Sequence, residues 1–341
     1  MESGGREMEQ QTIYTQLAEQ IGAGTSKLVP QILESLIDQN EAKLLLAASP
    51  PGTVDELAQW TGLDTSSING MVDPLFRKGL LFKAKKPDAT RYYRVRHLLQ
   101  FHDATLVMQD PPPQTLALWK EFMRTEWDDA IKIVESVLPR PAVRVVPINV
   151  AVEPASQIMV YDDVRNQLQA ARSIAVTKCS CRVVDGACGK PVEVCIQLDR
   201  AAEYAVERGT GRPLTRDQAL RMLDQCEEAG LVHVAENKQG VGNVICNCCK
   251  DCCINWTALR GGLGKFAAPS RFRAAINGED CTGCELCVDR CFFDAMTMIE
   301  AHAIAKVDQE KCMGCGVCRP VCPTDAISME LVRSQEFIPA H

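Results

Sequence analysis

Two cysteine-rich loops near the C-terminus of the chain share one spacing. The first reads C-x2-C-x2-C-x3-C from Cys281 to Cys291, and the second repeats it from Cys312 to Cys322, about 31 residues later. This run is typical of bacterial two-cluster ferredoxins, in which the fourth cysteine of each copy binds the cluster of the other copy. The spacing therefore predicts two [4Fe–4S] clusters. The expected ligands are Cys281, Cys284, Cys287 and Cys322 for one cluster, and Cys312, Cys315, Cys318 and Cys291 for the other.

The residues around these loops agree with iron–sulfur binding. Gly283 and Gly314 leave room for backbone amides to approach the sulfur atoms. Two zinc knuckles are the alternative, but zinc sites seldom use four cysteines in this spacing twice. The two copies differ after the last cysteine, where Phe292 and Phe293 stand in place of Pro323, and this difference removes no ligand.

The segment that carries the loops is acidic. From residue 279 to residue 341 it has 11 Asp or Glu against 5 Lys or Arg, and all-thiolate clusters would add further negative charge. We therefore expect a redox partner, a larger oxidoreductase, with a basic docking face.

Ten further cysteines lie between residues 179 and 253, in two groups and one isolated position. The first group suffices for a third [4Fe–4S] cluster, with a structural zinc ion as the alternative. The second group is so dense that its thiolates would repel one another unless a metal neutralised them, which predicts a fourth cluster, either separate or sharing ligands with the first group. The members are Cys179, Cys181, Cys188 and Cys195 in the first group, and Cys246, Cys248, Cys249, Cys252 and Cys253 in the second. Cys226 is isolated on an amphipathic helical pattern and is expected to be a buried core thiol.

Composition and cysteine usage indicate a reducing compartment. The first twenty residues are polar, without the apolar core of an export signal, and no apolar run is long enough to span a bilayer. We therefore expect a cytoplasmic protein without membrane insertion, whose thiols bind metals rather than form disulfides. The net charge of −7 argues against general affinity for nucleic acid or anionic lipid.

The elements that must position these cysteines predict an α+β protein of five segments. Residues 1–20 are expected to be a flexible N-terminal arm, 21–110 a winged-helix-like domain, 111–172 a helical and extended linker, 173–260 a Cys-rich α/β iron–sulfur domain, and 270–341 a bacterial-type dicluster ferredoxin fold. In the second segment, a capping box at residues 53–56 opens a short helix, a further helix runs from about 65 to 78 and ends at Gly79, and two strand-like runs at 80–82 and 91–95 form a wing. We also expect a helix at 116–138, a strand at 173–177 that leads to Cys179, and a helix capped by residues 215–218.

The expected wing is strongly basic. Between residues 77 and 96 there are eight Lys or Arg and one acid, Asp88, which suits contacts with DNA phosphates. The expected recognition helix, however, has no Arg or Lys before Arg77, and direct base readout leans on such side chains. Docking to an acidic protein surface, or homodimerisation through this domain, is therefore preferred over DNA binding.

Residues from about 145 to 329, with the Cys179-x-Cys181-Arg182, Cys246-x-Cys248-Cys249 and double ferredoxin motifs, resemble a group of multi-cluster 4Fe–4S ferredoxin-type proteins of anaerobes. Several members carry a winged-helix-like N-terminal region. The resemblance implies iron–sulfur binding and electron transfer in the cytoplasm of an anaerobe, and no specific reaction.

The function we expect is therefore electron transfer. Single electrons would pass through the two ferredoxin clusters and one or two further clusters, to or from a larger oxidoreductase. No dinucleotide or flavin motif occurs, so we expect an electron-transfer protein or oxidoreductase subunit rather than a stand-alone enzyme. The alternative is a redox-sensing transcription regulator that uses the winged helix on DNA. A catalytic thiol site in the 246–253 run is a third hypothesis.

Overall fold

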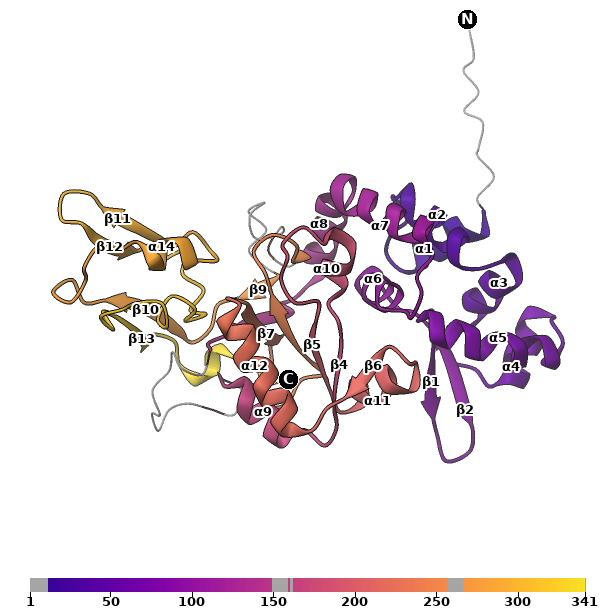
Figure 1. Ribbon diagram of the computed structural model, residues 1–341. Coiled ribbons are helices and arrows are strands. Elements are labelled where there is room, and N and C mark those ends of the chain that lie inside the picture. Colours follow the sequence, from indigo (N-terminus) through magenta and orange to yellow (C-terminus); the bar gives the residue numbers. More distant parts are fainter. Residues whose placement is uncertain (1–11, 149–158, 160–161, 255, 257–265, 341) are drawn as a thin grey trace, which may run out of the picture. The chain divides into compact units, whose positions relative to one another are not determined.

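The computed structural model describes residues 12–148, 159, 162–254, 256 and 266–340 (Figure 1). The chain divides into two compact units, residues 1–130 and residues 131–341, and each is considered by itself below. The whole is a mixed α+β protein. None of the helices in the described part of the chain combines the length and apolar character needed to cross a bilayer.

The first unit is mainly helical. Its elements are α1 (Ile13–Gln20), α2 (Leu28–Leu36), α3 (Gln39–Ala47), α4 (Val54–Thr61), α5 (Thr65–Lys78), β1 (Leu81–Lys85), β2 (Thr90–Arg94), α6 (Leu98–Leu106), α7 (Pro113–Thr125) and the start of α8 (Trp127–Val137). Strands β1 and β2 form an antiparallel hairpin. Apolar side chains of the helices, such as Ile32, Leu44 and Leu75, are fully buried and form the core.

Local sequence signals explain why α4 and α5 begin and end where they do. The Thr53 amide donates to the Glu56 carboxylate at 2.7 Å, and the Glu56 amide donates to the Thr53 hydroxyl at 3.3 Å, which is the predicted capping box. Helix α5 ends at Gly79, whose φ of 81° is left-handed. The predicted helices and hairpin of this region are thus confirmed.

Two predicted elements differ in the structure. Residues 13–20, assigned to the flexible arm, form helix α1, because Thr12 caps it and Leu17 packs into the core; residues 1–11 of the arm lie outside the described residues. The helix expected at 116–138 is two helices, α7 and α8, separated at Glu126. The Glu126 carboxylate accepts from the Ser26 hydroxyl and from the Lys27 amide, which holds the break against the start of α2.

The second unit is built on a seven-stranded sheet. The strands are β3 (Val143–Val146), β4 (Ile174–Lys178), β5 (Glu193–Leu198), β6 (Gly211–Pro213), β7 (Val232–Glu236), β8 (Val244–Cys248) and β9 (Ala267–Ala268), in the order β6-β4-β5-β8-β7-β3-β9. All neighbours are antiparallel except β3 and β9. The connections contain the helices α9 (Val164–Ala170), α10 (Ser180–Asp185), α11 (Arg200–Glu207) and α12 (Arg216–Glu228). The strand expected at 173–177 and the helix capped by residues 215–218 are confirmed as β4 and α12.

The two faces of the sheet have different neighbours. Helices α9 and α12 cover one face, where Leu168 and Leu223 pack against Ile196 and Ile245. On the other face Val232, Val234 and Cys248 belong to a core cluster that continues into the C-terminal part of the chain. The face under α9 and α12 thus has an aliphatic core, and the opposite face carries Cys248 and continues into the C-terminal module.

The C-terminal module, residues 266–340, contains two antiparallel pairs of short strands. Strand β10 (Phe272–Ile276) pairs with β13 (Ile327–Leu331), and β11 (Met296–Ile299) pairs with β12 (Ile304–Val307). Helix α14 (Leu286–Arg290) lies within the first cysteine run and carries Cys287, and the short helix η3 (Gln335–Phe337) ends the module.

The C-terminal module and the sheet share a continuous junction. The Arg271 guanidinium binds the Asp162 carboxylate at 2.5 Å, and both side chains are buried. The Ile148 amide, just after β3, donates to the Cys315 carbonyl at 3.0 Å. Near the end of the chain, the Pro339 carbonyl accepts from the Gln239 amide in the segment between β7 and β8. The C-terminal module is therefore packed against the sheet as part of the second unit.

Candidate metal and iron–sulfur centres

The first thiol site consists of four cysteines, Cys281, Cys284, Cys287 and Cys322, which line one cavity. The Ala305 amide donates to Cys281 Sγ at 3.5 Å. The Thr324 hydroxyl lies 3.8 Å from Cys322 Sγ and donates to the Asp280 carbonyl at 2.7 Å. Burial alone would raise the pKa of Cys322, but hydrogen bonds to its sulfur, that of the Thr324 amide first among them, lower it. The site therefore favours a thiolate at this position.

The second thiol site consists of Cys291, Cys312, Cys315 and Cys318, which line a second cavity. The Ala295 amide donates to Cys291 Sγ at 3.2 Å. Burial raises the pKa of Cys315 to about 12, and it raises the pKa of Cys318 as well. These thiols keep their protons unless a cation replaces them, as iron does in an iron–sulfur site. In both cavities three cysteines of one run meet the fourth of the other, which is the grouping that the spacing predicts.

Glycine is required in both loops. Gly283 and Gly314 have φ values of 69° and 68°. A Cβ on Gly283 would lie 2.3 Å from the Ala303 carbonyl oxygen, and one on Gly314 would lie 2.1 Å from the Phe272 carbonyl oxygen. Both loops are therefore pressed against a strand or turn backbone, which fixes the direction in which their cysteines point.

Gly314→Ala is expected to abolish iron binding at the second thiol site. A left-handed residue with a Cβ costs about 1–2 kcal/mol, and the contact with Phe272 would push the loop away from β10. Iron and acid-labile sulfide measured after anaerobic purification should each fall by about four per chain. Gly278→Ala is the matched control, because its Cβ would meet nothing closer than Ile304 at 3.6 Å. Full iron content in Gly314→Ala would contradict this account of the loop.

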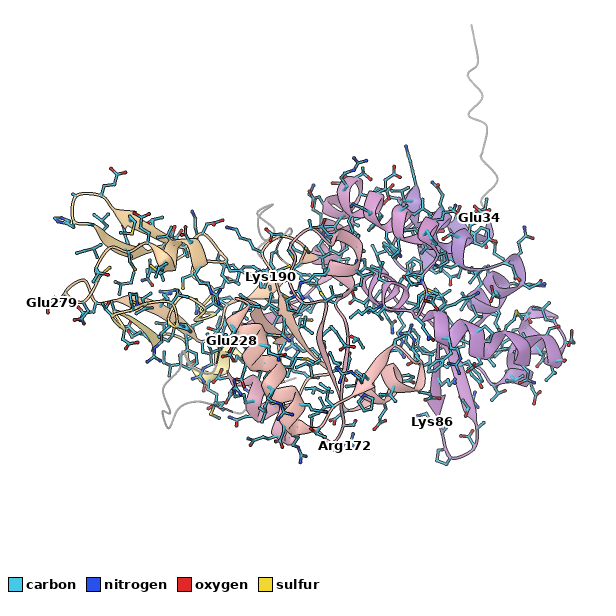
Figure 2. All side chains as sticks on the ribbon, in the orientation of Figure 1. Glu34, Lys86, Arg172, Lys190, Glu228 and Glu279 are labelled. Atoms are coloured by element: carbon cyan, nitrogen blue, oxygen red, sulfur yellow. The ribbon has the colours of Figure 1, made fainter. Side chains whose placement is uncertain are left out.

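The two thiol sites differ in exposure. At the second site Cys312, Cys315 and Cys318 are each less than a tenth exposed, whereas Cys284 of the first site is exposed. Figure 2 shows Glu279, just before the first cysteine loop, at the outer end of the module, far from Glu228 of α12. The first site therefore faces solvent, and the second lies between it and the sheet.

The upstream cysteines are divided between two places by the alternation of strand β8. Cys246 and Cys248 point to the sulfur-bearing face of the sheet, and the Cys248 thiol is in hydrogen-bond contact with the thiols of Cys246 and Cys253. Since Ile196 of β5 pairs with Ile245 of β8, Cys195 lies beside Cys246 on the same face. These four, Cys195, Cys246, Cys248 and Cys253, are called the strand-face group below. Contacts with Cys246 and Cys253, together with burial, raise the pKa of Cys248.

The strand-face group touches the second thiol site through a shared core. Cys248, Cys253 and Cys315 belong to one buried cluster, together with Trp256 and Phe292. The Trp256 ring lies 5.3 Å from the Phe292 ring and 5.0 Å from the Phe293 ring, both nearly edge-on. The Phe-Phe pair that replaces the proline of the second run thus joins the module to the cysteine-rich part of the sheet.

The remaining upstream thiols form a second group, in a core cluster separate from that of the strand-face group. The thiols of Cys188, Cys249 and Cys252 all lie within 4.8 Å of one another, and they are called the compact trio below. They pack with Cys179 and with Cys226 of α12. Cys181 is in hydrogen-bond contact with Cys179. Cys226 is 1% exposed, which confirms it as a buried core thiol. All 18 cysteines lie in the described part of the chain, and none of them forms a disulfide there.

Arg182 supplies a buried positive charge between the two upstream groups. Its side chain is 2% exposed and donates to the carbonyls of Pro191 at 2.7 Å and Asn247 at 2.6 Å. Burial opposes its ionisation, but the neighbouring thiols of Cys179 and Cys249 raise the pKa of the guanidinium. It therefore stays charged and offsets thiolate charge on either side.

A polar network behind β8 was not expected from the sequence. His233 contacts the Asn247 side chain at 2.6 Å through Nδ1 and the Glu227 carboxylate at 3.2 Å through Nε2. Asn247 also donates to the Val194 carbonyl at 2.7 Å. Both imidazole nitrogens of His233 are therefore engaged, and the network fixes the peptide that separates Cys246 from Cys248. The only signal in the sequence is the inward position of His233 on a strand.

Several cations of the basic 77–96 region form ion pairs within the first unit. Arg91 binds Glu56 at 2.9 Å, and Lys78 binds Glu41 at 2.9 Å. Asp73 binds Arg77 at 2.8 Å. Figure 2 shows Lys86 at the tip of the hairpin. These ion pairs involve four of the eight cations, Arg77, Lys78, Lys83 and Arg91.

Comparison with known families agrees with the geometry of the two C-terminal thiol sites. Residues 274–329 match the family model of a 4Fe–4S dicluster domain. No curated protein and no solved structure matches the chain. The chain therefore contains a ferredoxin-type 4Fe–4S dicluster domain with two clusters, which implies electron transfer, and its upstream cysteines include a group that could hold a further metal.

Proposed function

We propose that this protein is an electron carrier with three iron–sulfur centres in a row: the first thiol site, the second thiol site and the strand-face group. When bound, [4Fe–4S] clusters accept and release single electrons. The proposal rests on the core cluster that places Cys315 of the second site together with Cys248 and Cys253 of the strand-face group. Because these residues are buried in one cluster, the chain itself fixes the separation between the two centres.

The donor set of the strand-face group fits a third cluster. Four thiols converge on one sheet face, and no His or carboxylate is among them, which favours iron–sulfur binding or zinc over harder ions. The raised pKa of Cys248 indicates that these thiols are not stable as isolated thiolates. A bound cation would stabilise the thiolates by offsetting their charge, and Trp256 and Phe292 shield the group from water.

The exposed first site is the proposed docking point of the redox partner. Cys284 is exposed, and acidic residues such as Glu279 and Asp280 precede the loop. A partner oxidoreductase with a basic surface would bind here. The first unit is proposed to be a winged-helix module for protein docking. The ion pairs of Arg91, Lys78 and Arg77 make it a weaker match for DNA phosphates, so the redox-sensing regulator is the less favoured function.

Metal analysis of Cys248→Ala tests the proposal. The full chain, purified without oxygen, should contain about twelve iron and twelve sulfide, four for each centre. In Cys248→Ala both numbers should fall by about four, because one ligand of the third cluster is gone. Cys226→Ala is the matched control, since it also removes a buried thiol near the sheet but should keep all the iron.

Two outcomes would contradict the proposal. Iron and sulfide near eight in the wild-type chain would remove the third cluster. Unchanged values in Cys248→Ala would show that the strand-face group binds no iron. A mobility-shift assay with DNA from the region upstream of the protein's own gene tests the alternative function of a redox-sensing regulator. The assay compares the oxidised and reduced protein, and sequence-specific binding that changes on reduction would favour the regulator.

A further inference from the structure

We propose that Cys188, Cys249 and Cys252 bind a single thiophilic divalent ion, zinc or ferrous iron, and not an iron–sulfur cluster. The site is separate from the three centres proposed above, and its role is to tie the loop after β8 to the segment between β4 and β5.

The distances among the three thiols carry this inference. Zn–S bonds are about 2.3 Å long, so two thiolates on one ion lie at most about 4.6 Å apart. The compact trio is already gathered within 4.8 Å. In a cubane each cysteine binds a different iron, which needs a wider arrangement. Within the described ranges, the eight cysteines of the C-terminal module form no such close group.

The surroundings of the compact trio fit a closed, structural metal site. Cys249 and Cys252 are buried, and Val194, Leu231 and Cys226 form the apolar wall around them. Structural zinc sites are tetrahedral and have four protein ligands. Cys179 packs against the same wall, and a small movement of its thiol toward the compact trio would complete the set. Binding would release the thiol protons and leave net negative charge on the site.

Arg182 compensates this charge. Its guanidinium is buried beside Cys179 and Cys249, and it is anchored to the Pro191 and Asn247 carbonyls. Three or four thiolates around a divalent ion carry a charge of about −1 to −2, which one buried cation offsets in part. The ion would join Cys188 to residues about sixty positions later and so hold the loop that also carries Cys253.

Elemental analysis of the full chain with Cys188→Ala tests the inference. The anaerobically purified wild type should hold one zinc per chain, or one iron in excess of sulfide if the ion is ferrous. Cys188→Ala should lose this ion, with iron bound as cluster and acid-labile sulfide unchanged. Cys226→Ala, which removes a neighbouring thiol outside the trio, should retain it.

A joint loss of about four iron and four sulfide in Cys188→Ala would overturn the inference, because the trio would then be part of a cluster. The inference would also be overturned if Cys188→Ala and the wild type had the same metal content. If the variant does not fold, X-ray absorption at the zinc or iron edge of the wild type decides: sulfur ligands at about 2.3 Å around an isolated zinc support it, and absence of any ion outside the clusters overturns it. Sulfide content separates this outcome from failure of the third cluster, because the compact trio takes no sulfide.

Discussion

The Cys322→Ala variant should lose the cluster of the first thiol site, although Cys322 belongs to the second cysteine run. Its thiol lies in the cavity lined by Cys281, Cys284 and Cys287. Removing it leaves three ligands for a cluster that needs four. Iron and sulfide should each fall by about four per chain, and the electron paramagnetic resonance spectrum of the reduced protein should lose the coupling between neighbouring clusters.

Cys291→Ala is the matched partner of this variant and should lose the second cluster instead. The two variants would contain equal iron, so a second readout must tell them apart. A bulky hydrophilic oxidant should attack the cluster that remains in Cys291→Ala faster, because Cys284 of the first site is exposed whereas Cys315 of the second is buried. Equal oxidation rates, or the reverse order, would show that the cysteines are shared differently.

Arg182→Gln should lower the reduction potential of the third cluster and destabilise the second unit. Arg182 is the buried charge beside Cys179, Cys248 and Cys249. A reduced cluster carries one more negative charge, so losing the cation disfavours reduction. We expect a shift of about −60 mV or more, which is a tenfold change for a one-electron couple. Breaking such a buried charge arrangement should also cost about 3 kcal/mol in free energy of unfolding. Redox titration followed by electron paramagnetic resonance, together with denaturant unfolding, measures both.

Arg208→Gln provides the matched control. Arg208 is also buried, and burial lowers its pKa to about 10, with no cysteine contributing. Its replacement should cost stability and leave every potential unchanged. If Arg182→Gln behaved in the same way, Arg182 would be a packing residue only, and charge compensation would be excluded.

Short-range signals in the sequence predicted the parts of the fold that depend on neighbours in the chain. The Thr53–Glu56 capping box and Gly79 set helix ends through contacts a few residues apart. The C-x2-C-x2-C-x3-C runs gave the grouping of the eight C-terminal cysteines, because a tight loop leaves few other arrangements. The helix-end signals lie within one helical turn, and the first three cysteines of each run lie within one loop.

What the sequence did not reveal depends on pairing between distant strands. The 246–253 run looks like one site, but β8 turns Cys246 and Cys248 toward one side, and the following loop carries Cys249 and Cys252 to another. Which thiols meet is decided by the register of β8 with β5 and β7. Strand β3, within the segment expected to be a linker, likewise joins the sheet through its pairing with β7 and β9, which lie far from it in the sequence.

The aromatic junction between Trp256, Phe292 and Phe293 has a practical consequence for protein engineering. Because residues 274–329 match a family model by themselves, the dicluster domain is a natural choice for excision and fusion to another protein. Cut out on its own, it would present Phe292 and the Cys315 loop to water, since both are covered by the sheet in the intact chain. A minimal electron-transfer fragment of this chain should therefore begin before β3 and keep the whole second unit.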